Sequence, residues 1–75
     1  MAPGALDSVT KELIYIAVSV VNGCEYCVHS HTAVARKKGM TEEMRSELLS
    51  VIAMASQTNA LANAYQIEVD GSFKE

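Results

Sequence analysis

The residues best suited to chemistry lie together in one short stretch, which holds both cysteines and both histidines of the chain. Cys24 and Cys27 are three residues apart, and His31 follows four residues later. On a helix of 3.6 residues per turn, these three side chains lie within about 60° of one another around the axis. A thiolate is the reactive form of cysteine, and an imidazole one turn away can take the thiol proton directly or through one water. The spacing therefore predicts a redox-active thiol pair with a nearby base.

The position of Cys24 at the expected start of a helix supports this chemistry. Unpaired backbone N–H groups at a helix start favour negative charge, including a thiolate. If one sulfur is oxidised to sulfenic acid, the other can condense with it, because Cα atoms at i and i+3 are about 5 to 5.5 Å apart on a helix, within disulfide range. The carboxylate of Glu25 disfavours a neighbouring thiolate. We expect the helix end and His31 to outweigh it.

Glu12 is the acidic residue whose position is hardest to explain by solubility alone. It shares a helical stripe with Ile16 and Val20, so its carboxylate lies on or beside an apolar face. One interpretation is a solvated glutamate in the first turn of a helix, where the dipole favours it. The other is a partly buried carboxylate that orients or protonates a group in the thiol site. Both interpretations remain open from the residues alone.

The elements expected to position these residues make an all-α fold of three helices. Asp7 or Ser8 can cap the first helix, and Gly23 can end it in the left-handed conformation. The expected helices run from Asp7 or Ser8 to Val21, from about Cys24 to Lys38, and from a cap at Thr41 past Ala62. Residues 1–6 are expected to be an irregular lead-in and residues 69–75 a tail. The many β-branched residues between positions 13 and 21 would also suit a buried strand, but length, the cap and the lack of a partner strand favour a helix.

Two other helical features are read from charge and apolar spacing. The basic residues Arg36, Lys37 and Lys38 fall in the last turn of the second expected helix, where Gly39 supplies the stop, and are expected to be a solvated helix terminus. The third helix carries a long apolar stripe of core or subunit-contact residues, and residues 57–59 are expected to bend it or to lie at its surface. The stripe consists of Met44, Leu48, Val51, Ile52, Ala55 and Ala62.

Length and composition limit what the whole chain can be. Its 75 residues, 49% of them apolar, make one domain, residues 1–75, or part of one. A core of this size rarely supplies more than roughly 3–5 kcal/mol, so we predict a homo-oligomer that buries helix faces between subunits. A net charge of −3 disfavours nucleic acid as a partner. The longest apolar run is about half a membrane span and no signal leader is visible, so we predict a cytoplasmic protein that does not insert into a membrane.

Metal or haem binding is the first alternative for the Cys/His stretch. Cys24, Cys27 and His31 are suitable zinc ligands, but a fourth is missing because His29 points away from their stripe. Covalent haem attachment requires a histidine where this chain has Val28. We therefore predict no metal and no cofactor, and we expect His29 to be a surface or interface residue.

The spaced run of Glu12, eleven residues, Cys24-x-x-Cys27-x-x-x-His31 resembles the signature of the AhpD-like alkylhydroperoxidases within the carboxymuconolactone decarboxylase family. The segment AVSVVNGCEYCVHSHTAVARKKGMT is similar too, and the resemblance covers roughly residues 4–68. It implies an all-helical fold that assembles as trimers or hexamers. By this resemblance Cys27 attacks the peroxide and becomes sulfenic acid, Cys24 is the proton donor and resolving partner, and Glu12 and His31 form the proton relay.

The chain departs from the best-studied members in two ways. It is short, close to a single core motif, and it differs at one position of the motif. Those members carry a histidine immediately before the second cysteine, where this chain has Tyr26; Tyr26 either lines the pocket or packs. The decarboxylase branch generally lacks the cysteine pair, which argues against decarboxylation. The resemblance implies a hydroperoxide substrate, a lipoyl-type or similar dithiol as electron donor, and a peroxiredoxin to which electrons are passed. The sequence thus predicts an antioxidant thiol oxidoreductase that reduces organic hydroperoxides or a disulfide partner. The alternative is a non-catalytic helical oligomerisation or binding module with a vestigial or redox-sensing Cys-x-x-Cys.

Overall fold

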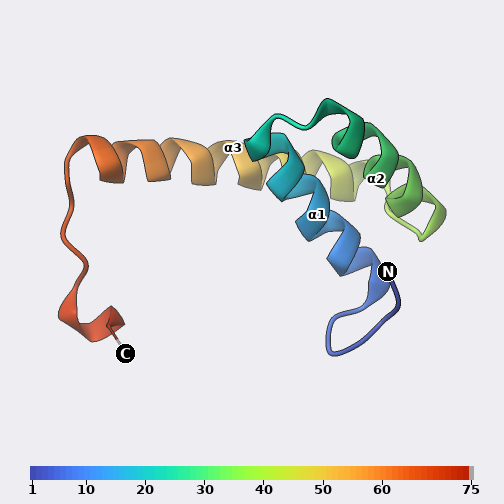
Figure 1. Cartoon of the computed structure of the whole chain (residues 1–75), viewed down its shortest axis with the longest axis horizontal. Coiled ribbons are helices and arrows are strands. Elements are labelled where there is room, and N and C mark those ends of the chain that lie inside the picture. Colours follow the sequence, from blue (N-terminus) through green and yellow to red (C-terminus); the bar gives the residue numbers. More distant parts are fainter. Residues whose placement is uncertain (75) are drawn as a thin grey trace.

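The architecture is a helical hairpin packed on one part of a long third helix. A computed structural model describes residues 1–74, and Figure 1 shows their arrangement. The described elements are α1 (Ser8–Asn22), α2 (Glu25–Lys37), α3 (Glu42–Ala64) and the short 3₁₀ helix η1 (Gly71–Phe73). No strand occurs among these residues, so the all-α prediction is confirmed and the β-branched run belongs to α1.

Local capping rules set both ends of α1. The Asp7 side chain accepts a hydrogen bond from the Thr10 backbone N–H at 2.7 Å, and this hydrogen bond lowers the pKa of Asp7. At the other end Gly23 has φ 73° and ψ 25°, and its N–H reaches the carbonyls of the last turn. This left-handed backbone is costly for a residue with a Cβ. The predicted glycine stop is confirmed, and it turns the chain directly into the cysteine pair.

The second helix begins one residue later than the earliest expected start. Cys24 is its N-cap, and the Cys24 Sγ accepts from the Cys27 N–H at 3.3 Å. At the other end Lys38 is the C-cap, and Gly39 follows with φ 109°. The Met40 N–H then bonds to the Ala35 carbonyl at 2.9 Å. This turn buries Met40 and fixes the backbone of Lys38 above α1.

The core lies where α1 meets α2 and the first part of α3. Its buried apolar residues are Ile16, Ala35 and Met40, with Leu13, Val20 and Leu48 packed around them. Such a small core buries little apolar surface, and most of the remaining apolar side chains are at least partly exposed. The core nevertheless places one face of α1 directly against α2, which is where the predicted site residues lie.

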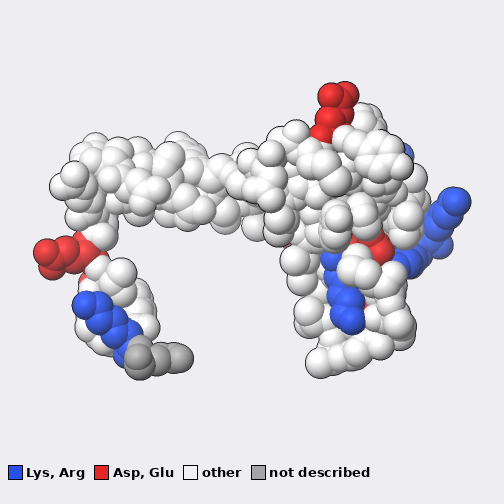
Figure 2. Space-filling view, in the orientation of Figure 1, with Lys and Arg blue, Asp and Glu red and all other residues white. Residues whose placement is uncertain are grey.

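The second half of α3 extends beyond the other helices (Figure 1). The helix is capped as expected by Thr41, whose hydroxyl accepts from the Met44 N–H at 3.1 Å, but none of its residues is buried. No charged residue occurs between Glu47 and Glu68, and Figure 2 shows the uncharged surface that results. Residues 57–59 do not interrupt the helix and are exposed. No helix among residues 1–74 is both long enough and apolar enough to cross a membrane.

The chain leaves α3 through an irregular segment. Gln66 has a positive φ of 55°, after which the chain reaches η1. Residues 69–74 are exposed and include this single 3₁₀ turn, which the expected tail of residues 69–75 did not anticipate. Residue 75 lies outside the described residues.

Candidate active site

Cys24 and Cys27 are joined by a disulfide at the beginning of α2. Their Cα atoms are 5.3 Å apart, within the range that a disulfide requires. The Cys24 N–H bonds to the Ser19 carbonyl at 2.9 Å, so the end of α1 holds the N-cap in place. The predicted proximity of the two sulfurs is therefore confirmed.

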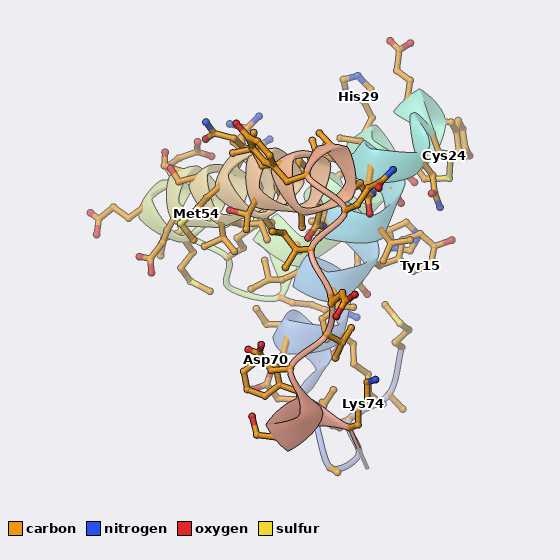
Figure 3. All side chains as sticks on the ribbon, turned by 90° about the vertical axis from the view of Figure 1, so that its left-hand side faces the viewer. Tyr15, Cys24, His29, Met54, Asp70 and Lys74 are labelled. Atoms are coloured by element: carbon orange, nitrogen blue, oxygen red, sulfur yellow. A yellow bond between two sulfur atoms is a disulfide. The ribbon has the colours of Figure 1, made fainter. Side chains whose placement is uncertain are left out.

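An apolar cleft of about 560 Å³ lies beside the disulfide. Cys24 and Cys27 line one part of it, and α1 supplies most of the remaining wall. Figure 3 shows Cys24 and Tyr15 on the same side of the molecule. The lining residues are Met1, Leu6, Lys11, Ile14, Tyr15, Val18, Ser19, Asn22, Cys24 and Cys27. The cleft therefore offers an apolar surface beside the cysteine pair.

Glu12 and His31 form a short hydrogen-bonded pair between α1 and α2. Glu12 is only 1% exposed, and its Oε1 lies 2.6 Å from His31 Nδ1. Of the two interpretations of Glu12, the structure therefore shows the buried one. A carboxylate accepts from an N–H, so Nδ1 of His31 carries the proton, and Nε2 of a neutral ring is left with its lone pair. The carboxylate thereby selects which ring nitrogen can act as a base.

Lys38 corrects the prediction that the basic run at the end of α2 is entirely solvated. Its Nζ donates to Glu12 Oε2 at 2.8 Å, whereas Arg36 pairs with Glu42 at 3.0 Å and Lys37 is exposed. The turn after α2 carries Lys38 back over α1, and helix spacing within α2 alone does not reveal this. The hydrogen bonds from His31 and Lys38 lower the pKa of Glu12, despite the opposing effect of burial. In return, the hydrogen bond to Glu12 raises the pKa of Lys38.

Tyr15 is a second residue of the site that sequence reasoning missed. Its ring stacks on the His31 imidazole with centroids 3.7 Å apart and an interplanar angle of 22°. The same residue lines the cleft beside the disulfide. Its position three residues after Glu12 places both side chains on one face of α1. That spacing was a usable signal, because a helix that directs Glu12 to His31 brings Tyr15 to the same neighbour.

The two other residues singled out from the sequence lie apart from this cluster. Tyr26 is 83% exposed and is absent from the residues that line the cleft. The His29 side chain is 80% exposed, with Nε2 3.9 Å from Glu25 Oε1, and Figure 3 shows it projecting away from Tyr15 and Cys24. Across residues 1–74, no group of three or more His, Cys, Asp or Glu side chains is arranged to hold a metal ion.

A disulfide at a helix start, near a buried Glu12 that is hydrogen-bonded to His31 in an all-α fold, defines a helical thiol–disulfide domain. Residues 1–68 match the carboxymuconolactone decarboxylase family. The chain therefore belongs to this family, and within it the chain is AhpD-like, as the resemblance predicted.

The chain is also similar to individual proteins, among them two relatives by sequence and one solved structure. It is 38% identical to a protein of the cox locus of Paracoccus denitrificans, over 95% of this chain and 68% of that protein. It is 42% identical to the alkyl hydroperoxide reductase AhpD of Solibacter usitatus, over 85% of this chain but 34% of the relative. A crystal structure of an alkylhydroperoxidase AhpD core from Rhodospirillum rubrum superposes with a TM-score of 0.94 at 56% identity. That alignment covers 97% of this chain and 54% of the solved one. The chain thus spans only part of the AhpD proteins that it matches.

Proposed function

We propose that this domain is an antioxidant thiol peroxidase that reduces organic hydroperoxides through the Cys24–Cys27 pair. The observation that carries the proposal is the disulfide at the wall of an apolar cleft. An apolar lining suits an alkyl or aryl hydroperoxide better than hydrogen peroxide. The names of the AhpD relatives and of the superposed AhpD core support the same activity.

The proposed reaction begins at the Cys27 sulfur of the reduced domain. The Cys27 thiolate attacks one peroxide oxygen, the O–O bond breaks, and the alcohol leaves after taking up one proton. Cys27 is then a sulfenic acid, and the Cys24 thiol displaces its hydroxyl as water, forming the disulfide. A dithiol then returns two electrons and two protons by thiol–disulfide exchange. The peroxide is reduced and the dithiol oxidised, with the domain unchanged over the cycle.

His31 and Glu12 are proposed to move the proton that this attack requires. Cys27 and His31 are four residues apart on α2, so their Cβ atoms are about 5–6 Å apart, a distance that one water can bridge. His31 would accept the Cys27 proton and later return one to the leaving alkoxide. Glu12 holds Nδ1 and stabilises the imidazolium formed in between.

The electron donor and the assembly belong to the same proposal. A lipoyl-type dithiol would reduce the disulfide, in the cytoplasm, where dithiol carriers are kept reduced, and the reduced cysteine pair would in turn reduce the disulfide of an oxidised peroxiredoxin. The long uncharged surface of α3 is proposed to bury itself in a homo-oligomer, a trimer or a hexamer. If the cysteine pair proves inactive, the same surface favours the alternative of a helical oligomerisation module.

The test is consumption of cumene hydroperoxide by the reduced chain in the presence of excess dihydrolipoamide. Wild type is expected to turn over, and Cys27→Ser is expected to lose turnover, because serine at this position cannot form the sulfenic acid. His29→Gln serves as the matched control, since His29 is exposed and lies apart from the site. Equal rates for wild type and Cys27→Ser would reject the peroxidase and leave the oligomerisation module.

A further inference from the structure

The buried carboxylate of Glu12 has two hydrogen-bond partners, His31 and Lys38. The proton relay proposed above uses His31 but not Lys38. We propose that Lys38 is a positioning residue, which keeps Glu12 ionised and directed at His31. This inference rests on the proposed function, because the thiol chemistry of Cys27 gives the Glu12–His31 pair its purpose. It assigns a role to a residue that does not line the cleft.

The hydrogen bonds divide the two oxygens of Glu12 between two partners. Oε1 faces His31 Nδ1 at 2.6 Å, and Oε2 faces Lys38 Nζ at 2.8 Å. Among residues 1–74, the remaining cation within ion-pair distance of Glu12 is the Met1 amino group, at 3.9 Å from Oε2. Because Glu12 is 1% exposed, water does not replace a lost partner readily. Without Lys38, Oε2 would lack its short charge-assisted hydrogen bond, and burial would favour the protonated acid.

The Lys38 ammonium is held in place by a well-fixed backbone. As the C-cap of α2, Lys38 donates its N–H to carbonyls of the last turn, including those of Val34 and Ala35. The following turn is anchored by buried Met40. The contact therefore depends on the end of α2, 26 residues from Glu12 in the chain.

The ionised state of Glu12 matters for the base at His31. A carboxylate accepts the Nδ1–H and stabilises the imidazolium that forms when Nε2 takes the thiol proton. A neutral carboxylic acid does neither as well, so the thiolate of Cys27 would form less readily at acidic pH. Loss of Lys38 is thus expected to weaken the reaction most on the acid side of its pH profile.

The experiment measures alkylation of the reduced chain by iodoacetamide between pH 5 and pH 9, with the Cys27 product resolved by peptide mass spectrometry. Lys38→Met is expected to react about tenfold more slowly than wild type at pH 6, well below the 10²–10⁴-fold that a general base contributes. The acid limb of the pH profile for alkylation should lie at higher pH in Lys38→Met than in wild type. Lys38→Gln, which keeps a hydrogen-bond donor without the charge, should fall between the two, and Lys38→Arg should restore the wild-type profile.

Lys37→Met is the matched control. It removes the same charge from an exposed position, one residue away from Lys38 in the chain. The inference is overturned if Lys38→Met and Lys38→Gln both keep the wild-type profile, or if Lys37→Met shifts it equally. Circular dichroism identifies any variant that fails to fold, and Lys38→Gln and Lys38→Arg then decide the question. Alkylation does not require turnover of peroxide. A shifted profile in a chain that consumes no hydroperoxide would therefore reject the peroxidase and retain the role of Lys38.

Discussion

At the scale of single residues, the site is organised around the buried carboxylate of Glu12. His31 and Lys38 compensate its charge by donating hydrogen bonds to its two different oxygens, and Tyr15 covers the imidazole face. Within residues 1–74, every fully buried side-chain nitrogen or oxygen has a hydrogen-bond partner. This arrangement makes the site part of the fold, because removal of His31 or Lys38 leaves one oxygen of the buried Glu12 carboxylate without its short hydrogen bond.

The same carboxylate should make stability depend on pH. The folded state lowers the pKa of Glu12 from its usual 4.5, so its stabilising contribution is present above pH 4.5 and is lost as pH falls through the folded-state pKa. The raised pKa of Lys38 has the opposite sign: its contribution is complete below the usual value of 10.5 and is lost as pH rises through the folded-state pKa. We therefore expect urea midpoints to fall on both sides of a neutral plateau.

Glu12→Gln tests the loss of stability that is expected at acidic pH. It should be less stable than wild type at pH 7, because the amide cannot compensate the Lys38 charge, and the difference should shrink below pH 4.5. Glu43→Gln, at an exposed position in the first turn of α3, is the control. If the difference between wild type and Glu12→Gln does not change with pH, the linkage to Glu12 is absent.

At the scale of elements, local rules explain what the sequence predicted and packing explains what it did not. The caps at Asp7 and Thr41 and the stop at Gly23 are short-range features, and all three are present. The thiol pair was predictable for the same reason, since helix spacing alone brings Cys24 and Cys27 together. Lys38 reaches Glu12 only because α2 packs on α1, and no periodicity within one helix encodes that contact.

The left-handed backbone of Gly23, which ends α1, gives a direct prediction for the stability of the domain. Gly23→Ala should destabilise the domain by about 1–2 kcal/mol, the cost of a left-handed residue with a Cβ. Nothing lies within 4 Å of the added Cβ, so the cost comes from the backbone alone. Gly71→Ala is the matched control, because its Cβ also meets nothing and its φ is not positive. Thermal unfolding of both variants measures the difference, and equal loss in the two would contradict the argument.

At the scale of the whole molecule, two features bear on the stability of a single chain. One is the small core, and the other is the exposed second half of α3, here called the arm. The core buries three apolar residues, while the chain exposes others of similar size along α3, such as Met54 at 62% and Leu61 at 49%. A domain with so small a core gains stability when such a surface is covered by another subunit. The arm is also uncharged from position 48 to position 67, which removes the usual electrostatic barrier to association.

Charge introduced on this arm should therefore separate the subunits. Met54→Lys with Leu61→Lys is expected to convert an assembly of three or six 8.1 kDa chains into monomers, because each lysine would be buried without a partner at the interface. Native mass spectrometry and light scattering measure the mass directly. Ala33→Lys, at an exposed position on α2, adds one lysine charge away from the arm and should leave the assembly intact. A monomeric wild type would contradict the predicted assembly itself. A double variant with wild-type mass would show that α3 is not the subunit contact, and the exposed apolar face of α1 would then have to serve instead.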